Sequence, residues 1–182
     1  MTNTISEAEI SLKVALFFLK NQLTDSDISV SLDGAHIKTG DTIHFDIWTF
    51  FKKIHAVKIF GDDNKWQGTY QLPNIKPNLI IHSQPGCGDV IINLHTGKRM
   101  YIESKKGCAI KTKSNQEYGL LREAIGQLMT GFNFNEYTIP AVAIPYTPKN
   151  LELTTKWSQY SQIKQLGIQF LLVNTEGDVV QI

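Results

Sequence analysis

From residue 79 onward, short β-rich runs alternate with two helical patterns, and this alternation constrains the fold more than any other feature. We expect strands at 79–82, 89–94, 99–105, 138–144, 168–173 and 178–182, with helices opening at 114 and spanning 151–166. The strands at 89–94 and 99–105 flank His95-Thr96-Gly97-Lys98, which is typical of a tight hairpin turn. Such an order of elements predicts a mixed α/β domain.

The first 78 residues predict an opening helix followed by a β-rich region. Ser6-Glu7-Ala8-Glu9 is a capping box, and apolar residues continue at helical spacing to about Gln22. The β-rich region is expected to hold hairpins over 28–37 and 57–72, with a segment between them, 43–54, that fits either a helix or a strand. No repeat or linker interrupts the chain. We expect a single domain over 1–182, in which 1–78 elaborates a core formed by 79–182.

Composition excludes several classes of protein. The chain is 42% hydrophobic and 19% charged, as ordinary globular proteins are. Its longest apolar run, Val14–Leu19, is far shorter than the ~20 residues that a membrane-spanning helix needs. Two cysteines are too few for a disulfide framework, and their spacing does not suggest zinc. The start of the chain lacks a secretory pattern, so we expect a cytoplasmic protein without membrane association.

Basic residues gather in one part of a chain whose net charge is only +1. Between Lys98 and Lys113 there are six Lys or Arg and one acid, Glu103. A solvated strand face would explain such a cluster, whereas contact with phosphates would give Lys106, Lys111 and Lys113 a role in binding nucleic acid.

Three charged residues are expected to meet at one end of the 89–105 hairpin. Glu103 and Lys105 are two apart on a strand and so share a face. If the loop containing Gly97 has three residues, either Glu103 or Lys105 lies opposite Asp89. Two carboxylates suit Mg²⁺, and Lys105 could orient a water or offset charge on a phosphate. The alternative is an exposed edge strand carrying cross-strand ion pairs.

These residues resemble a known family. Gly88-Asp89-Val90 followed by Tyr101-Ile102-Glu103-Ser104-Lys105 is similar to the motif of the PD-(D/E)XK nuclease superfamily, and the order of elements resembles it over about 79–173. The resemblance implies a restriction-endonuclease-like core, a mixed central sheet flanked by helices. It also implies that Asp89 and Glu103 bind Mg²⁺, or Mn²⁺, while Lys105 assists the attacking water.

The same resemblance implies two accessory residues. Many members carry an extra acidic residue in the first helix, where this chain has Glu9, although the capping box explains Glu9 equally well. One branch of the superfamily carries a glutamine on the helix after the motif, which corresponds to Gln127.

We therefore expect a metal-dependent nuclease that hydrolyses phosphodiester bonds, in particular a DNA endonuclease of restriction or defence type. Cutting both strands of a duplex would favour a homodimer, by analogy with other proteins of this fold. The alternative is a non-catalytic subunit that keeps the nuclease fold and serves nucleic-acid binding or assembly. The near-zero net charge favours this alternative, and the intact Asp89, Glu103 and Lys105 oppose it.

Overall fold

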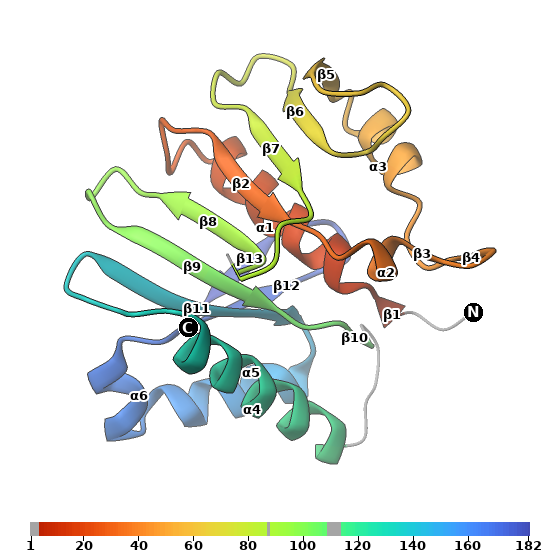
Figure 1. Cartoon of the computed structure of the whole chain (residues 1–182). Helices are drawn as coiled ribbons and strands as arrows, with labels where there is room; N and C mark the ends of the chain where they lie inside the picture. Colours follow the sequence, from red (N-terminus) through yellow and green to blue (C-terminus); the bar gives the residue numbers. More distant parts are fainter. Residues whose placement is uncertain (1–3, 87, 109–113) are drawn as a thin grey trace.

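A computed structural model of the chain describes residues 4–86, 88–108 and 114–182 (Figure 1). Lys111 and Lys113 of the basic cluster lie outside the described residues. No helix in the described ranges is both long enough and apolar enough to cross a membrane.

A mixed sheet of nine strands runs through the described residues. In spatial order its strands are β13 (Val179–Gln181), β12 (Gln169–Val173), β11 (Thr138–Pro145), β9 (Arg99–Ser104), β8 (Val90–Asn93), β2 (Ile28–Ser31), β7 (Leu79–His82), β6 (Gly68–Gln71) and β5 (Val57–Phe60). β9 and β11 are parallel, as are β11 and β12, whereas β8 and β9 form an antiparallel hairpin. Two short antiparallel pairs lie outside this sheet: β1 (Thr4–Ile5) with β10 (Gly107–Cys108), and β3 (Lys38–Thr39) with β4 (Thr42–Ile43).

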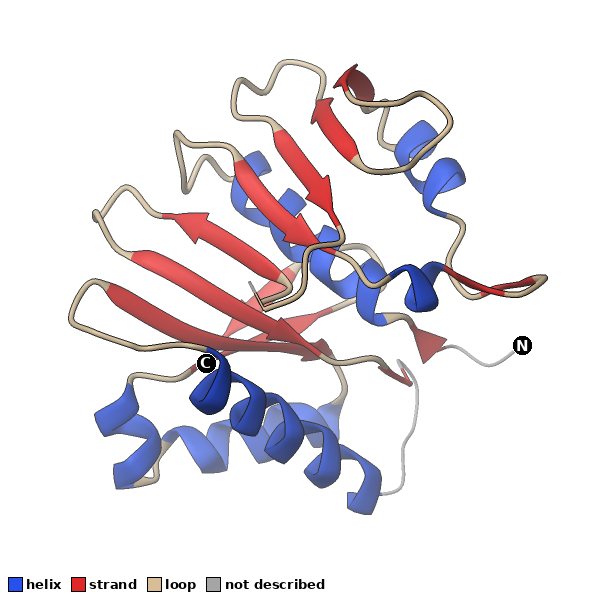
Figure 2. Cartoon of the chain, in the orientation of Figure 1, coloured by secondary structure: helices blue, strands red, loops and turns tan. Residues whose placement is uncertain are grey.

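Helices cover both faces of the sheet (Figures 1 and 2). They are α1 (Glu7–Lys20), α2 (Gly34–Ile37), α3 (Ile47–Lys53), α4 (Ser114–Gly131), α5 (Pro148–Ser158) and α6 (Ser161–Leu166). Side chains alternate along β11 because successive residues of a strand point to opposite faces. Ala141 and Ala143 therefore join the core that contains α1, and Val142 and Ile144 join the core under α4 and α5. The mixed α/β class with a central sheet between helices is confirmed.

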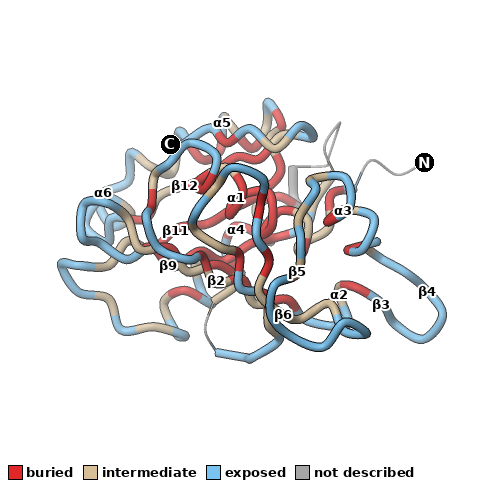
Figure 3. Tube along the Cα trace, turned by 90° about the horizontal axis from the view of Figure 1, so that it is seen from above, coloured by how far each residue is buried: buried red, intermediate tan, exposed pale blue. Residues whose placement is uncertain are grey.

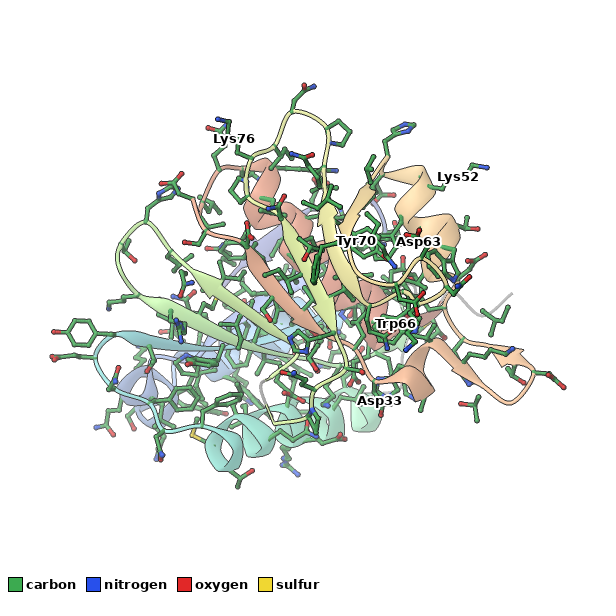
Figure 4. All side chains as sticks on the ribbon, turned by 45° about the horizontal axis from the view of Figure 1, so that its top comes forward. Asp33, Lys52, Asp63, Trp66, Tyr70 and Lys76 are labelled. Carbon is green, nitrogen blue, oxygen red and sulfur yellow. The ribbon has the colours of Figure 1, made fainter. Side chains whose placement is uncertain are left out.

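Burial follows this layering. The most deeply buried segments run along α1, β11 and β12, whereas β3 and β4 form an exposed arm (Figure 3). β2 and β7 are parallel, so Lys76, just before β7, and Asp33, just after β2, lie at opposite ends of the sheet (Figure 4). The end near Asp33 is the one that carries the cavity described below.

Two of the expected elements are wrong. The segment 28–37 is not a hairpin, because Oδ1 of Asp33 accepts a hydrogen bond from the amide of Ala35 and caps the short helix α2 instead of closing a turn. The expected single helix over 151–166 is two helices, α5 and α6, which are separated at 159–160.

Other local predictions are confirmed. Ser6 caps α1 through a 3.1 Å hydrogen bond from the amide of Glu9, and β5 and β6 form the second hairpin. The ambiguous segment 43–54 is mainly helix, since Asp46 caps α3.

The expected division at residue 79 does not match the sheet. β2 lies between β7 and β8, and α1 packs against β8, β9 and β11. The first 78 residues therefore supply a central strand and a covering helix of the core, not only an elaboration of it. The sequence could not show this, because β2 finds its partners, β7 and β8, about 50 and 60 residues away along the chain.

Candidate active site

β8 and β9 form a hairpin, and Asp89 directly precedes β8. Val90 pairs with Ile102, and the amide of Asp89 donates a 3.0 Å hydrogen bond to the carbonyl of Ile102. Asp89 therefore lies beside the end of β9 that carries Glu103, next to but outside the regular pairing of the two strands.

Backbone groups of two neighbouring strands hold Asp89 in place. The amide of Ser104 donates a 2.7 Å hydrogen bond to Oδ2 of Asp89, and the amide of Ser31 donates a 2.8 Å bond to its carbonyl. Gly88 precedes it with a φ of +71°, and a Cβ at this position would lie 2.9 Å from Cζ of Phe132. A glycine therefore suits the bend that presents Asp89, because it has neither the strain nor the clash.

Lys105 lies among carboxylates. Its Nζ is 3.2 Å from Oε1 of Glu103, 3.5 Å from Oε1 of Glu123 on α4 and 3.7 Å from Oε1 of Glu7 at the start of α1. Ser104, between Glu103 and Lys105, points to the other face, where its hydroxyl is 2.9 Å from that of Ser11. The expected shared face of Glu103 and Lys105 is confirmed.

Glu103 and Lys105 are buried, with 9% and 4% of their surfaces exposed. β9 lies between β8 and β11 in the sheet, and Glu103 pairs with Val142 of β11. The alternative of an exposed edge strand with surface ion pairs is therefore wrong. Unpaired charges at such a depth are costly, so these residues must offset one another or bind something charged.

Burial and mutual repulsion raise the pKa values of the carboxyl groups. Burial, followed by repulsion from Glu103, raises the pKa of Asp89 to about 8, although the amide of Ser104 and the ammonium of Lys105 oppose the shift. Burial also raises the pKa of Glu103 against the opposing effect of Lys105. Burial alone would lower the pKa of Lys105, but Glu7 and Glu103 outweigh it and the pKa is raised. The site thus favours a bound cation, which would relieve the repulsion between its carboxylates.

An open cavity of about 630 Å³ gives access to these groups. Glu7, Asp89, Glu103 and Lys105 line it, together with Gln127 of α4. Asp89, Glu103, Lys105 and Gln127, four of the residues chosen from the sequence, therefore meet at one cavity.

Glu9, the fifth, does not line the cavity. It lies 2.6 Å from Nζ of Lys13, one turn further along α1, while Glu7 occupies the place at the cavity that the sequence assigned to Glu9. Ser11, one turn after Glu7, contacts Ser104 of β9, so Glu7 shares the side of the helix that faces β9, and only the structure identifies that side.

Lys106 is exposed and lines a different, smaller cavity. His82 bonds to Ser29 across neighbouring strands and does not line the cavity of Asp89.

The carboxylate oxygens of Asp89 and Glu103 are ligands suited to a hard cation that is held by few protein groups. Within the described residues, no three His, Cys, Asp or Glu side chains are arranged so that they could hold a metal ion. Mg²⁺ is commonly bound through one or two carboxylates and keeps several waters. Asp89 and Glu103, which line one cavity and repel each other, fit that mode of binding.

Comparison of the chain with protein-family models, curated proteins and solved structures gave no match.

Proposed function

We propose that the chain is a metal-dependent nuclease of the PD-(D/E)XK type, built on a restriction-endonuclease-like core and acting on DNA as an endonuclease. The observation that carries this proposal is the convergence of Asp89, Glu103 and Lys105 on one open cavity at the end of a central hairpin. A structural salt bridge alone would not require three further features. These are a glycine bend before Asp89, a surplus of carboxylates over ammonium groups, and solvent access to all of them.

Each residue has a role that follows from its position. Asp89 and Glu103 would hold Mg²⁺ or Mn²⁺, which when bound supplies polarisation of the phosphoryl oxygens and acidification of water. Lys105 carries a compact charge beside Glu103, where it can orient the attacking water or offset charge that develops on the phosphate. Gln127 of α4 also lines the cavity and can contact substrate from there.

The direct test is incubation of the purified protein with plasmid, linear, single-stranded and branched DNA, with Mg²⁺ or with EDTA. We expect cleavage that requires the metal and is lost in both Asp89→Asn and Glu103→Gln. Retention of near wild-type cleavage by either variant would contradict the site assignment. Binding of DNA without cleavage of any substrate would favour the non-catalytic subunit.

Metal binding can be measured apart from cleavage. A ligand that binds only the folded state raises the melting temperature. Mg²⁺ or Mn²⁺ should therefore stabilise the wild type, and the increase should disappear in Asp89→Asn. An equal increase in that variant would place the metal elsewhere.

The basic cluster supplies the expected contact with the DNA backbone. If Lys106, Lys111 and Lys113 neutralise phosphates, their joint replacement by glutamine should weaken binding of all DNA sequences and reduce the slope of log K against log salt by about 3. An unchanged slope would mean that the cluster is a solvated face.

A further inference from the structure

A second cavity, of about 200 Å³, is the one that the exposed Lys106 lines, and it shares no lining residue with the cavity of Asp89. Its walls come from β1, β10, the end of β11 and the first turns of α4 and α5. Most of the lining is apolar and includes Leu120, Ile144 and Pro145. Glu117 of α4 and Asn150 of α5 also line it.

Both polar residues are deeply buried and incompletely bonded. Only 3% of Glu117 and 5% of Asn150 is exposed. Among the described residues, neither Oε2 of Glu117 nor Oδ1 of Asn150 has a hydrogen-bond partner. Buried acceptors are nearly always satisfied in native proteins, so two in one cavity call for an explanation.

The neighbouring bonds fix the direction of both acceptors. Nδ2 of Asn150 donates a 2.8 Å bond to the carbonyl of Pro145, which determines that the oxygen of the amide is the free atom. The hydroxyl of Thr147 accepts from the amide of Asn150 at 2.9 Å and donates, at 3.5 Å, to Oε1 of Glu117. Oε2 of Glu117 is thereby left as the second free acceptor.

Two free acceptors, one of them on a carboxylate, define the chemistry of a ligand. The ligand must donate at least two hydrogen bonds, and a positive charge on it would offset the buried carboxylate. A primary ammonium group has three N–H donors, and the apolar walls suit a short hydrocarbon chain. We infer that this cavity binds a small primary amine in its ammonium form, with the charged head at Glu117 and Asn150 and the apolar part against Leu120 and Ile144.

This inference does not depend on the proposed nuclease activity. Burial raises the pKa of Glu117 although the hydrogen bond from Thr147 and the more distant ammonium of Lys149 oppose the shift, and no ion pair of Glu117 is found among the described residues. The cavity is smaller than the ~300 Å³ at which drug-sized sites begin, and this limits the ligand to a few heavy atoms.

The experiment is a titration of the full chain with n-butylammonium chloride at constant ionic strength. Binding is measured in two ways, as the heat released in calorimetry and as the increase in melting temperature. We expect saturable binding that is weakened at least about tenfold in Glu117→Gln, which keeps the shape of the side chain but removes its charge. Glu152→Gln is the matched control, because Glu152 is exposed on α5 and pairs only with Lys149 among the described residues. This control should bind like the wild type, and equal binding by all three proteins would overturn the inference.

A second comparison needs no variant and holds even if Glu117→Gln fails to fold. Tetramethylammonium has the charge without N–H donors, and n-butanol has the chain without the charge. Both should bind the wild type at least about tenfold more weakly than n-butylammonium does. Equal binding of n-butylammonium and tetramethylammonium, or no saturable binding of n-butylammonium, would show that the two acceptors do not form an amine site.

Discussion

The backbone amide of Ser104 donates a 2.7 Å hydrogen bond to Oδ2 of Asp89. Ser104, the last residue of β9, lies between Glu103 and Lys105, so the same stretch of backbone that carries these two residues also holds the carboxylate of Asp89. Asp89, just before β8, and Lys105, just after β9, are thus held by backbone hydrogen bonds to the neighbouring strands, at Ser104 and Ile102 for Asp89 and at Ala143 for Lys105. Such rigidity is what a site that must orient a reacting group requires.

The raised pKa of Asp89 predicts how stability depends on pH. Burial brings this pKa from an ordinary value of 3.8 to about 8, so within that window the folded protein keeps a proton that the unfolded chain releases. The free energy of unfolding should then fall as the pH rises from about 4 to about 8. We expect the melting temperature, measured in EDTA, to decrease less over this range in Asp89→Asn than in the wild type. Parallel curves for the two proteins would contradict the assignment.

Lys105 and Lys106 should differ sharply when replaced. Lys105→Ala leaves Glu7 and Glu103 without their shared ammonium, which should cost up to about 3–5 kcal/mol of stability. Below its melting temperature this variant should bind DNA but lose most of its cleavage rate, because the interaction acts mainly in the transition state.

Lys106→Ala is the control, since Lys106 is exposed and lines the other cavity. Its rate constant for cleavage and its melting temperature should match the wild type. Loss of cleavage in Lys106→Ala with a normal Lys105→Ala would reverse the assigned roles.

Glu7 should matter for the reaction and Glu9 should not. Glu7 lies at the cavity and raises the pKa values of Asp89, Glu103 and Lys105, so Glu7→Gln should lower the cleavage rate by about 10–100-fold. It should also move the acidic limb of the pH–rate profile to lower pH, because a repelling charge is removed. Among the described residues the carboxylate of Glu9 pairs with Lys13, away from the cavity, so the profile of Glu9→Gln should not move. Equal profiles for the two variants would mean that Glu7 is only structural.

Gly88 can be tested against Gly86, which has a similar φ but no neighbour within 4 Å of an added Cβ. Both alanine variants carry the strain of a positive φ, about 1–3 kcal/mol, but only Gly88→Ala also displaces Phe132. We expect Gly88→Ala to be the less stable variant by thermal unfolding and to lose more cleavage activity, since it moves Asp89. Identical behaviour would show that the contact with Phe132 does not position the site.

The sequence predicted correctly those features that depend on contacts between residues close together along the chain. The cap at Ser6, the hairpin over 57–72 and the shared face of Glu103 and Lys105 all depend on residues close in sequence. The position of β2 could not be predicted, because it depends on pairing between distant segments and not on β-propensity. Glu7 was missed for a related reason. Its role arises from where α1 crosses β9, which helical periodicity does not specify.

The insertion of β2 between β7 and β8 makes the two parts of the chain interdependent. A break in the exposed arm at Gly40 would leave Glu7 and β2 on one piece, and Asp89, Glu103 and Lys105 on the other. Neither piece could complete the sheet or the cavity alone, so the two would have to associate as subunits do. The segments before and after Gly40 therefore depend on each other as the two subunits of a heterodimer do, although the exposed β3–β4 arm joins them in one polypeptide.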